Sequence, residues 1–160
     1  MSTLALSFDV RQYLSHHLAD VFSTMVSLPA TLAADGRMPH FEDRVTGSVG
    51  FGGENVTGAV YLHMSATLAV RVTSSMLGLP PEEVTGDSEV NDVVGEMTNM
   101  LAGGLKSTLC DLGATCAVST PAIIRGTAFE IEALPDVRRE TMVFDCEAER
   151  VVVEVHIKFN

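Results

Sequence analysis

The sequence predicts an α+β fold in which helices pack on a mostly antiparallel sheet. Apolar residues recur at helical spacing in three segments, and they alternate at strand spacing in the segments between and after these helices. The predicted order is therefore one helix, two strands, two helices and then several strands. The 160 residues include no long linker and no low-complexity segment, so we expect a single domain over residues 1–160.

The first predicted helix covers residues 9–27. Asp9 is a suitable N-cap. The apolar residues that follow recur on one helical face: Val10, Leu14, Leu18, Val21, Phe22, Met25 and Val26. Pro29 and the loop that runs to Pro39 end this helix.

A pair of strands is predicted next, over residues 44–51 and 57–64. The link between them, Gly52-Gly53-Glu54-Asn55, has the composition and length of a hairpin turn. Glycine-rich loops also bind phosphate, but such loops lead directly into a helix, and none follows here. We therefore interpret these glycines as turn residues.

Two helices follow the hairpin. Ser65 is placed to cap a helix over residues 66–77, which Gly78 ends. A polar link leads to the longest predicted helix, over residues 88–111, and Gly113 stops it.

The rest of the chain is predicted to be rich in strands. Residues 117–124 form a strand that Pro121 bends or confines to an edge, and residues 127–134 form a weaker one. Strong strand patterns cover residues 141–147 and 150–159. Apolar and polar residues alternate in the last strand. We expect it to have one buried face and a polar face open to a partner, and it is a candidate for edge pairing with another chain.

Composition argues against several classes of function. The net charge is -11 and no basic run occurs, which argues against binding nucleic acid or an anionic membrane. No stretch approaches the ~18 apolar residues of a membrane span. The N-terminus also lacks a secretion signal, so we expect a cytoplasmic protein.

The cysteines and histidines predict no metal site. Three cysteines are an odd number and form no CxxC pair, which favours free thiols over disulfides or zinc ligands. The five histidines are scattered without ligand spacing. No Walker loop, GxSxG elbow or dinucleotide-binding glycine motif is present.

The helix over residues 88–111 has two contrasting faces. At about 100° per residue, its apolar residues gather on one side. These are Val90, Val93, Val94, Met97, Leu101 and Leu105. On the opposite side, four residues fall within roughly 60° of one another. They are Asp92, Glu96, Asn99 and Gly103, and we call them the polar ridge.

The polar ridge has two possible meanings. The simpler one is a solvated helix face. Against it, Asp92 and Glu96 are like charges at i, i+4, which costs a few tenths of a kcal/mol. Asn99, Gly103 and Gly104 are poor helix formers, each costing up to roughly 1 kcal/mol relative to alanine. A bare glycine beside an amide would let the backbone of another protein come close.

The spacing Asp92-x-x-x-Glu96-x-x-Asn99, followed by Pro121, resembles the signature of the CheC/CheX/FliY phosphatases of bacterial chemotaxis. The order of elements is also similar, including the glycine-rich hairpin and the phrase Met76-Leu77-Gly78 at a helix end. The resemblance extends over nearly the whole chain. CheC-like members usually carry two such motifs, whereas this chain shows one, as CheX does.

This resemblance implies a CheC/CheX-like fold and a hydrolase, a protein phosphatase that dephosphorylates the phospho-aspartate of a CheY-like response regulator in two-component signalling. By analogy, Asn99 positions the attacking water and Glu96 docks the receiver domain. Asp92 and Gly103 are then candidate partner-binding residues. The resemblance implies no cofactor in this chain, because the receiver supplies the Mg²⁺, and it implies a CheX-like homodimer.

Other interpretations compete with the enzyme. The same fold could serve as a non-catalytic module that binds a receiver or a flagellar-switch partner. A structural subunit related to the middle domain of FliM would share the fold, but it predicts no Glu-x-x-Asn face and fits less well. An unrelated domain that binds a small molecule has no support in the residue pattern.

Overall fold

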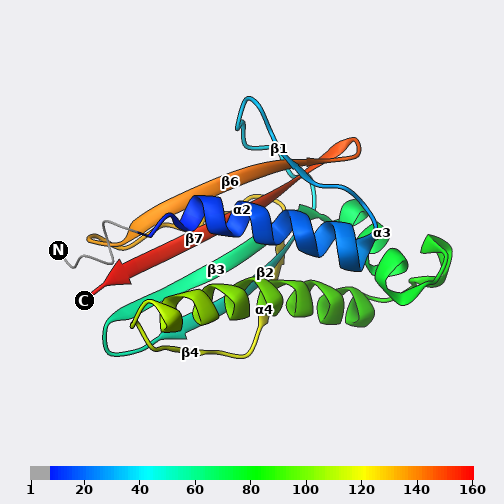
Figure 1. Ribbon diagram of the computed structural model, residues 1–160. Coiled ribbons are helices and arrows are strands. Elements are labelled where there is room, and N and C mark those ends of the chain that lie inside the picture. The colour runs from blue at the N-terminus through cyan, green and yellow to red at the C-terminus, as the bar shows by residue number, and fades with distance from the viewer. Residues whose placement is uncertain (1–7) are drawn as a thin grey trace.

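A computed structural model describes residues 8–160 and confirms the α+β class. Within these residues, three α-helices pack on one face of a seven-stranded sheet (Figure 1). They are α2 (Val10–Val21), α3 (Ala66–Leu77) and α4 (Asp87–Asp111). Helices α2 and α4 lie side by side and run in opposite directions across the sheet, as Figure 1 shows.

The sheet has the order β1-β6-β7-β3-β2-β4, and β5 also pairs with β2. Its strands are β1 (Thr31–Leu32), β2 (Arg44–Gly52), β3 (Val56–Ser65), β4 (Ala117–Val118), β5 (Ala122–Gly126), β6 (Arg138–Cys146) and β7 (Glu149–Phe159). Every pairing between them is antiparallel. The predicted hairpin is confirmed as β2–β3, and the two strong C-terminal strand patterns also pair with each other, as β6–β7.

Local signals set the helix ends as predicted. The Asp9 side chain accepts a hydrogen bond of 3.0 Å from the Gln12 backbone and begins α2. Ser65 does the same for α3 through the Leu68 backbone at 3.0 Å. Gly78 ends α3 with a φ of +68°, a left-handed conformation that glycine adopts without a steric penalty. After α2 the chain continues as a π-helical turn, Phe22–Val26.

Two strand predictions are wrong. Residues 127–134 form a bend and irregular chain instead of a strand. Strand β7 does not lie at an edge, because it is hydrogen-bonded to β6 on one side and to β3 on the other. The alternation of apolar and polar residues reports the two faces of a strand, but it carries no information about the neighbours that complete its hydrogen bonds.

The polar face of β7 is also not open. Glu154 is 2% exposed and His156 is 7% exposed, although this face lies away from the helices. The loop before β2 covers part of it, where Ala33 and Phe41 form a small apolar cluster with residues of β6 and β7. The sheet is therefore buried on both faces in this region.

The main core lies between the helices and the sheet. Helix α4 approaches β2 closely at Gly47, where a side chain would overlap the hydroxyl of Thr98. That hydroxyl donates to the backbone carbonyl of Val94 at 2.7 Å, so it is satisfied inside the core. This close contact fixes the helix that carries the polar ridge against the sheet.

Two further predictions can be checked on the described residues. Cys110, Cys116 and Cys146 are free thiols, as predicted. Over residues 8–160, no helix combines the length and the apolar character that crossing a membrane requires.

Candidate functional site

Helix α4 presents its two faces as the wheel predicts. All six residues of the apolar face are buried. On the polar ridge, Asp92 and Glu96 are exposed, whereas Asn99 and Gly103 are half-buried. The helix therefore buries one side against the sheet and turns the other toward solvent.

The side chains of Glu96 and Asn99 are available to a partner. In residues 8–160, neither side chain takes part in a hydrogen bond or an ion pair, and neither has a buried, unpaired polar atom. Asn91, on the same helix, is different, because its side-chain oxygen accepts two hydrogen bonds from Arg125 of β5, at 2.8 and 3.2 Å. The structure thus holds Asn91 in place and leaves Asn99 free.

One flank of the ridge is formed by the chain that follows α4. Pro121 lies beside Gly95, one residue before Glu96, and a side-chain carbon at Gly95 would stand 3.4 Å from the Pro121 ring. Strand β5, which begins at Ala122, pairs with β2 beneath α4. The fold therefore brings together the Glu-x-x-Asn segment and the proline that the sequence motif links.

The other flank is formed by α2, and sequence reasoning missed it. A side-chain carbon at Gly104 would stand 2.6 Å from Nε2 of His17 and 2.7 Å from the hydroxyl of Tyr13. Nε2 of His17 also lies 3.0 Å from the carbonyl oxygen of Met100, the residue after Asn99. Gly104 is thus a packing glycine between two helices. Around Gly103, in contrast, no described atom stands within 4 Å of such a carbon.

The chemistry of this arrangement suits a protein partner. The amide of Asn99 can donate and accept hydrogen bonds at once, so it can hold a water molecule without removing its proton. The carboxylate of Glu96, three positions earlier on the same helix face, can pair with a cation on a docked surface. The ridge residues line none of the five best-formed cavities of the described chain.

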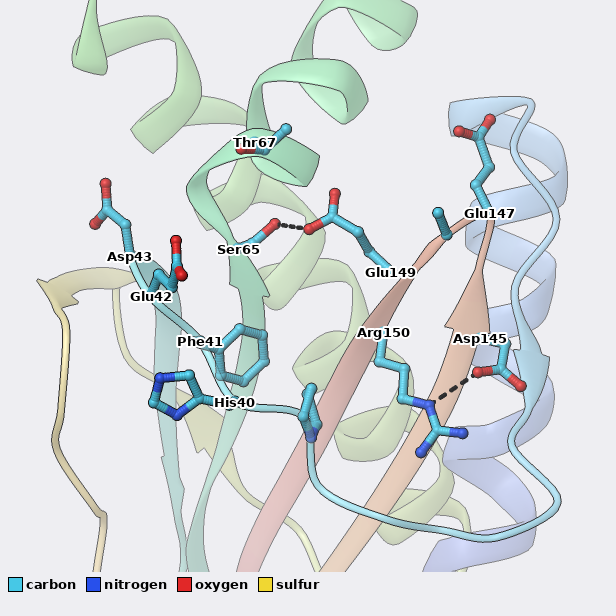
Figure 2. A pocket seen from close by; sticks show the side chains of 12 residues that line it. His40, Phe41, Glu42, Asp43, Ser65, Thr67, Asp145, Glu147, Glu149 and Arg150 are labelled. Atoms are coloured by element: carbon cyan, nitrogen blue, oxygen red, sulfur yellow. Dashed lines mark hydrogen bonds and ion pairs between the residues drawn. The ribbon is translucent and has the colours of Figure 1, made fainter.

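A separate cavity of about 580 Å³ lies at the β6–β7 turn and the start of α3 (Figure 2). Acidic side chains crowd it, but three of them already have partners. Arg150 contacts Asp145 at 3.0 Å, and Ser65 donates a hydrogen bond to Glu149. Glu147 forms an ion pair with Arg71. Within the described residues, no group of histidine, cysteine and acidic side chains could hold a metal ion.

Comparisons with known proteins indicate the family and the fold. The family model described as "Chemotaxis phosphatase CheX" matches residues 45–147, which include the polar ridge and Pro121. A search of curated proteins found no significant match.

Solved structures share the fold over nearly the whole chain. The chemotaxis protein CheX from Vibrio vulnificus is 26% identical with a TM-score of 0.78, and the match covers 94% of this chain and 97% of that one. A CheC-like superfamily protein from Shewanella sp. PV-4 is 26% identical with a TM-score of 0.75, and 99% of each chain is covered. A CheX–CheY–BeF3–Mg²⁺ complex from Borrelia burgdorferi matches at 20% identity and a TM-score of 0.73, covering 94% of this chain and 98% of that one.

Proposed function

Because the chain belongs to the CheX family of chemotaxis phosphatases, we propose that it hydrolyses the phospho-aspartate of a CheY-like receiver domain. One observation carries this proposal. Glu96 and Asn99 lie one helical turn apart on an exposed face, without partners among the described residues, inside the segment that the family model matches. The Borrelia burgdorferi relative was solved with CheY, BeF3 and Mg²⁺, which supports a receiver as the class of partner.

In this proposal, Asn99 positions the attacking water. An acyl phosphate is already activated, and the receiver supplies its own Mg²⁺ and lysine, so this chain needs no cofactor. The remaining requirement is a water held in line with the phosphorus atom and its leaving oxygen. The Asn99 amide can orient that water by donating one hydrogen bond and accepting another.

Glu96 has a different role in the proposal, which is to dock the receiver. Its carboxylate would pair with the receiver lysine, and this pair would be shielded from water once the two surfaces meet. Such a shielded pair is worth more than an exposed one. Asp92 would extend the acidic edge, and Gly103 would let the receiver backbone approach the helix closely.

The test is phosphate release from a labelled receiver domain by the wild type and by Asn99→Ala. We expect the variant to lose about 100-fold or more in turnover, because the water is no longer held in line. Receiver binding and thermal stability should change little. Asn91→Ala is the matched control, since Asn91 lies on the same helix but binds Arg125, and it should keep wild-type turnover.

Two outcomes would count against this assignment. Near-normal turnover by Asn99→Ala would remove the water-positioning role. Stoichiometric binding of the phosphorylated receiver by the wild type, with no phosphate release, would favour the non-catalytic module.

A further inference from the structure

Arg44 lies on the sheet face opposite the helices and is 8% exposed. Its guanidinium carbon stands 3.5 Å from the centre of the Phe129 ring and 5.4 Å from the centre of the Phe41 ring. One of its terminal nitrogens donates a hydrogen bond to the Phe129 carbonyl. A cation is therefore held between two aromatic rings at the end of β2.

Among the described residues, Arg44 forms no ion pair with a carboxylate. Its Nε atom is buried without a hydrogen-bond partner. Burial lowers the pKa of Arg44, and the attraction of Glu154 only partly opposes this effect. A buried charge without a paired counter-ion is costly.

The neighbouring Glu154 is already engaged. Its two oxygens contact Nε2 of His63 at 3.2 Å, Nε2 of His156 at 2.6 Å and Nε of Arg139 at 2.9 Å. Arg139 is therefore the ion-pair partner of this carboxylate. Glu154 attracts Arg44 but forms no ion pair with it.

A cavity of about 580 Å³ opens beside Arg44. Its size is within the range of small-molecule sites, which is about 300–1,000 Å³. Its wall combines apolar side chains, including Met38, Phe41, Phe129 and Ile131, with charged side chains of both signs: Arg44, Arg139, Glu130 and Glu154. Arg139 pairs with Glu154 at 2.9 Å, which leaves Arg44 as the cation of this wall that has no ion pair among residues 8–160.

The aromatic wall depends on a glycine. At Gly126, a side-chain carbon would stand 3.0 Å from the Phe129 ring, which is tighter than ordinary contact. Glycine therefore lets the chain after β5 fold back and place Phe129 over Arg44. The site is formed by the fold itself, before any ligand arrives.

We propose that this cavity binds a small organic anion, whose carboxylate or phosphate oxygens pair with the Arg44 guanidinium while a flat apolar body packs against Phe41 and Phe129. A guanidinium presents its donors in a planar fork that matches both kinds of oxyanion. No residue of the polar ridge lines this cavity, so the proposal is independent of the phosphatase assignment.

The experiment titrates four probes into the whole protein: benzoate, phenyl phosphate, acetate and inorganic phosphate. Binding is followed by the NMR signal of the Arg44 Nε–H and by the melting temperature. We expect saturable shifts with benzoate or phenyl phosphate, and affinities about tenfold or more weaker for the two probes that lack a ring. The stronger of the two aromatic probes identifies the preferred oxyanion.

Variants decide whether Arg44 is responsible. Arg44→Gln should abolish the shift in melting temperature, and Arg138→Gln should retain it. Arg138 is the matched control, because it lies on β6 next to Arg139 but pairs with Glu140 at 2.7 Å and does not line the cavity. If Arg44→Gln does not fold, Arg44→Lys keeps the charge, and it should bind about tenfold or more weakly because ammonium lacks the planar fork.

The proposal is overturned if no probe gives a saturable shift in the wild type at millimolar concentrations. It is also overturned if Arg44→Lys binds as tightly as the wild type, or if Arg138→Gln loses binding to the same extent as Arg44→Gln. Loss of phosphatase activity has no bearing on this test, since its readouts are the Arg44 signal and the melting temperature.

Discussion

Glu96 and Asn99 belong to one exposed helix face, yet we propose different physical tasks for them. A carboxylate acts on a partner through charge, whereas an amide acts on a water through the direction of its hydrogen bonds. The two roles therefore make different predictions for affinity and for turnover, and substitutions that keep the side-chain shape can separate them.

Replacing Glu96 by Gln removes the charge and keeps the length of the side chain. We expect the KM for the phosphorylated receiver to rise about tenfold or more, because the shielded pair with the receiver lysine is lost. The control is Glu89→Gln, since Glu89 is an exposed acid in the first turn of α4. An unchanged affinity of Glu96→Gln for the phosphorylated receiver would contradict the docking role.

At the scale of elements, two adjacent glycines of α4 have opposite surroundings. Gly104 faces α2, where His17 and Tyr13 occupy the space that a side chain would need. Gly103 faces open space on the polar ridge. Residue type and helix propensity are the same at both positions, so only the packing of α2 against α4 distinguishes them.

This contrast predicts opposite changes in stability for the two alanine variants. Gly103→Ala should raise the free energy of unfolding by about 0.4–1 kcal/mol, because alanine favours the helix and nothing obstructs it. Gly104→Ala should lower it by about 1 kcal/mol, because the methyl group displaces the ends of the His17 and Tyr13 side chains and disturbs the contact of His17 with the Met100 carbonyl. Urea unfolding measures both values, and equal effects would disprove the difference in packing.

The Gly103→Ala variant also tests whether Gly103 lies in the contact with the receiver. If Gly103 allows close approach, Gly103→Ala should weaken receiver binding even though it stabilises the fold. If Gly103→Ala is more stable than the wild type and binds the receiver with wild-type affinity, Gly103 lies outside the contact.

At the scale of the whole molecule, a buried polar network joins three strands on the sheet face away from the helices. Glu154 of β7 contacts His63 of β3, His156 of β7 and Arg139 of β6. Burial tends to raise the pKa of Glu154, but the hydrogen bonds from the two histidines and the charge of Arg139 outweigh it and lower this pKa from 4.5 to about 2.

This shift predicts how stability depends on pH. At pH values between these two pKa values, the folded protein keeps Glu154 ionised, whereas the same carboxylate takes up a proton in the unfolded chain. The stabilisation is therefore complete above a pH of 4.5 and is lost as the pH falls toward about 2. Its size is about 3 kcal/mol at 1.36 kcal/mol per pKa unit.

Urea unfolding of the wild type and of Glu154→Gln, from neutral pH to a pH of about 3, tests this expectation. The stability difference between the two proteins should shrink as the medium becomes acidic, because the variant has no carboxylate to titrate at this position. A difference that stays constant over this range would rule out a lowered pKa for Glu154.

The assembly is the remaining prediction at this scale. We propose a homodimer, as the resemblance to CheX implies. Sedimentation or light scattering at micromolar concentration should therefore give twice the 17.1 kDa mass of one chain. A mass of one chain would count against the dimer. The edges of the described sheet are β1 on one side and β4 with β5 on the other.

The local features of this protein followed from the sequence alone. Asp9 and Ser65 cap their helices and Gly78 ends one, because capping depends on residues within a few positions of each other. The two faces of α4, and with them the exposure of Glu96 and Asn99, followed from helical periodicity. The motif that indicates the family lies within this same periodic segment.

Only the tertiary structure decided which segments become neighbours. It placed β7 between β6 and β3, buried Glu154, and gave Gly104 a packing role that helix propensity does not reveal. It also brought Phe129 over Arg44 across 85 positions of sequence. The physical reason is that local patterns record which side of an element is apolar, whereas the contacts of both sides depend on residues distant in the chain.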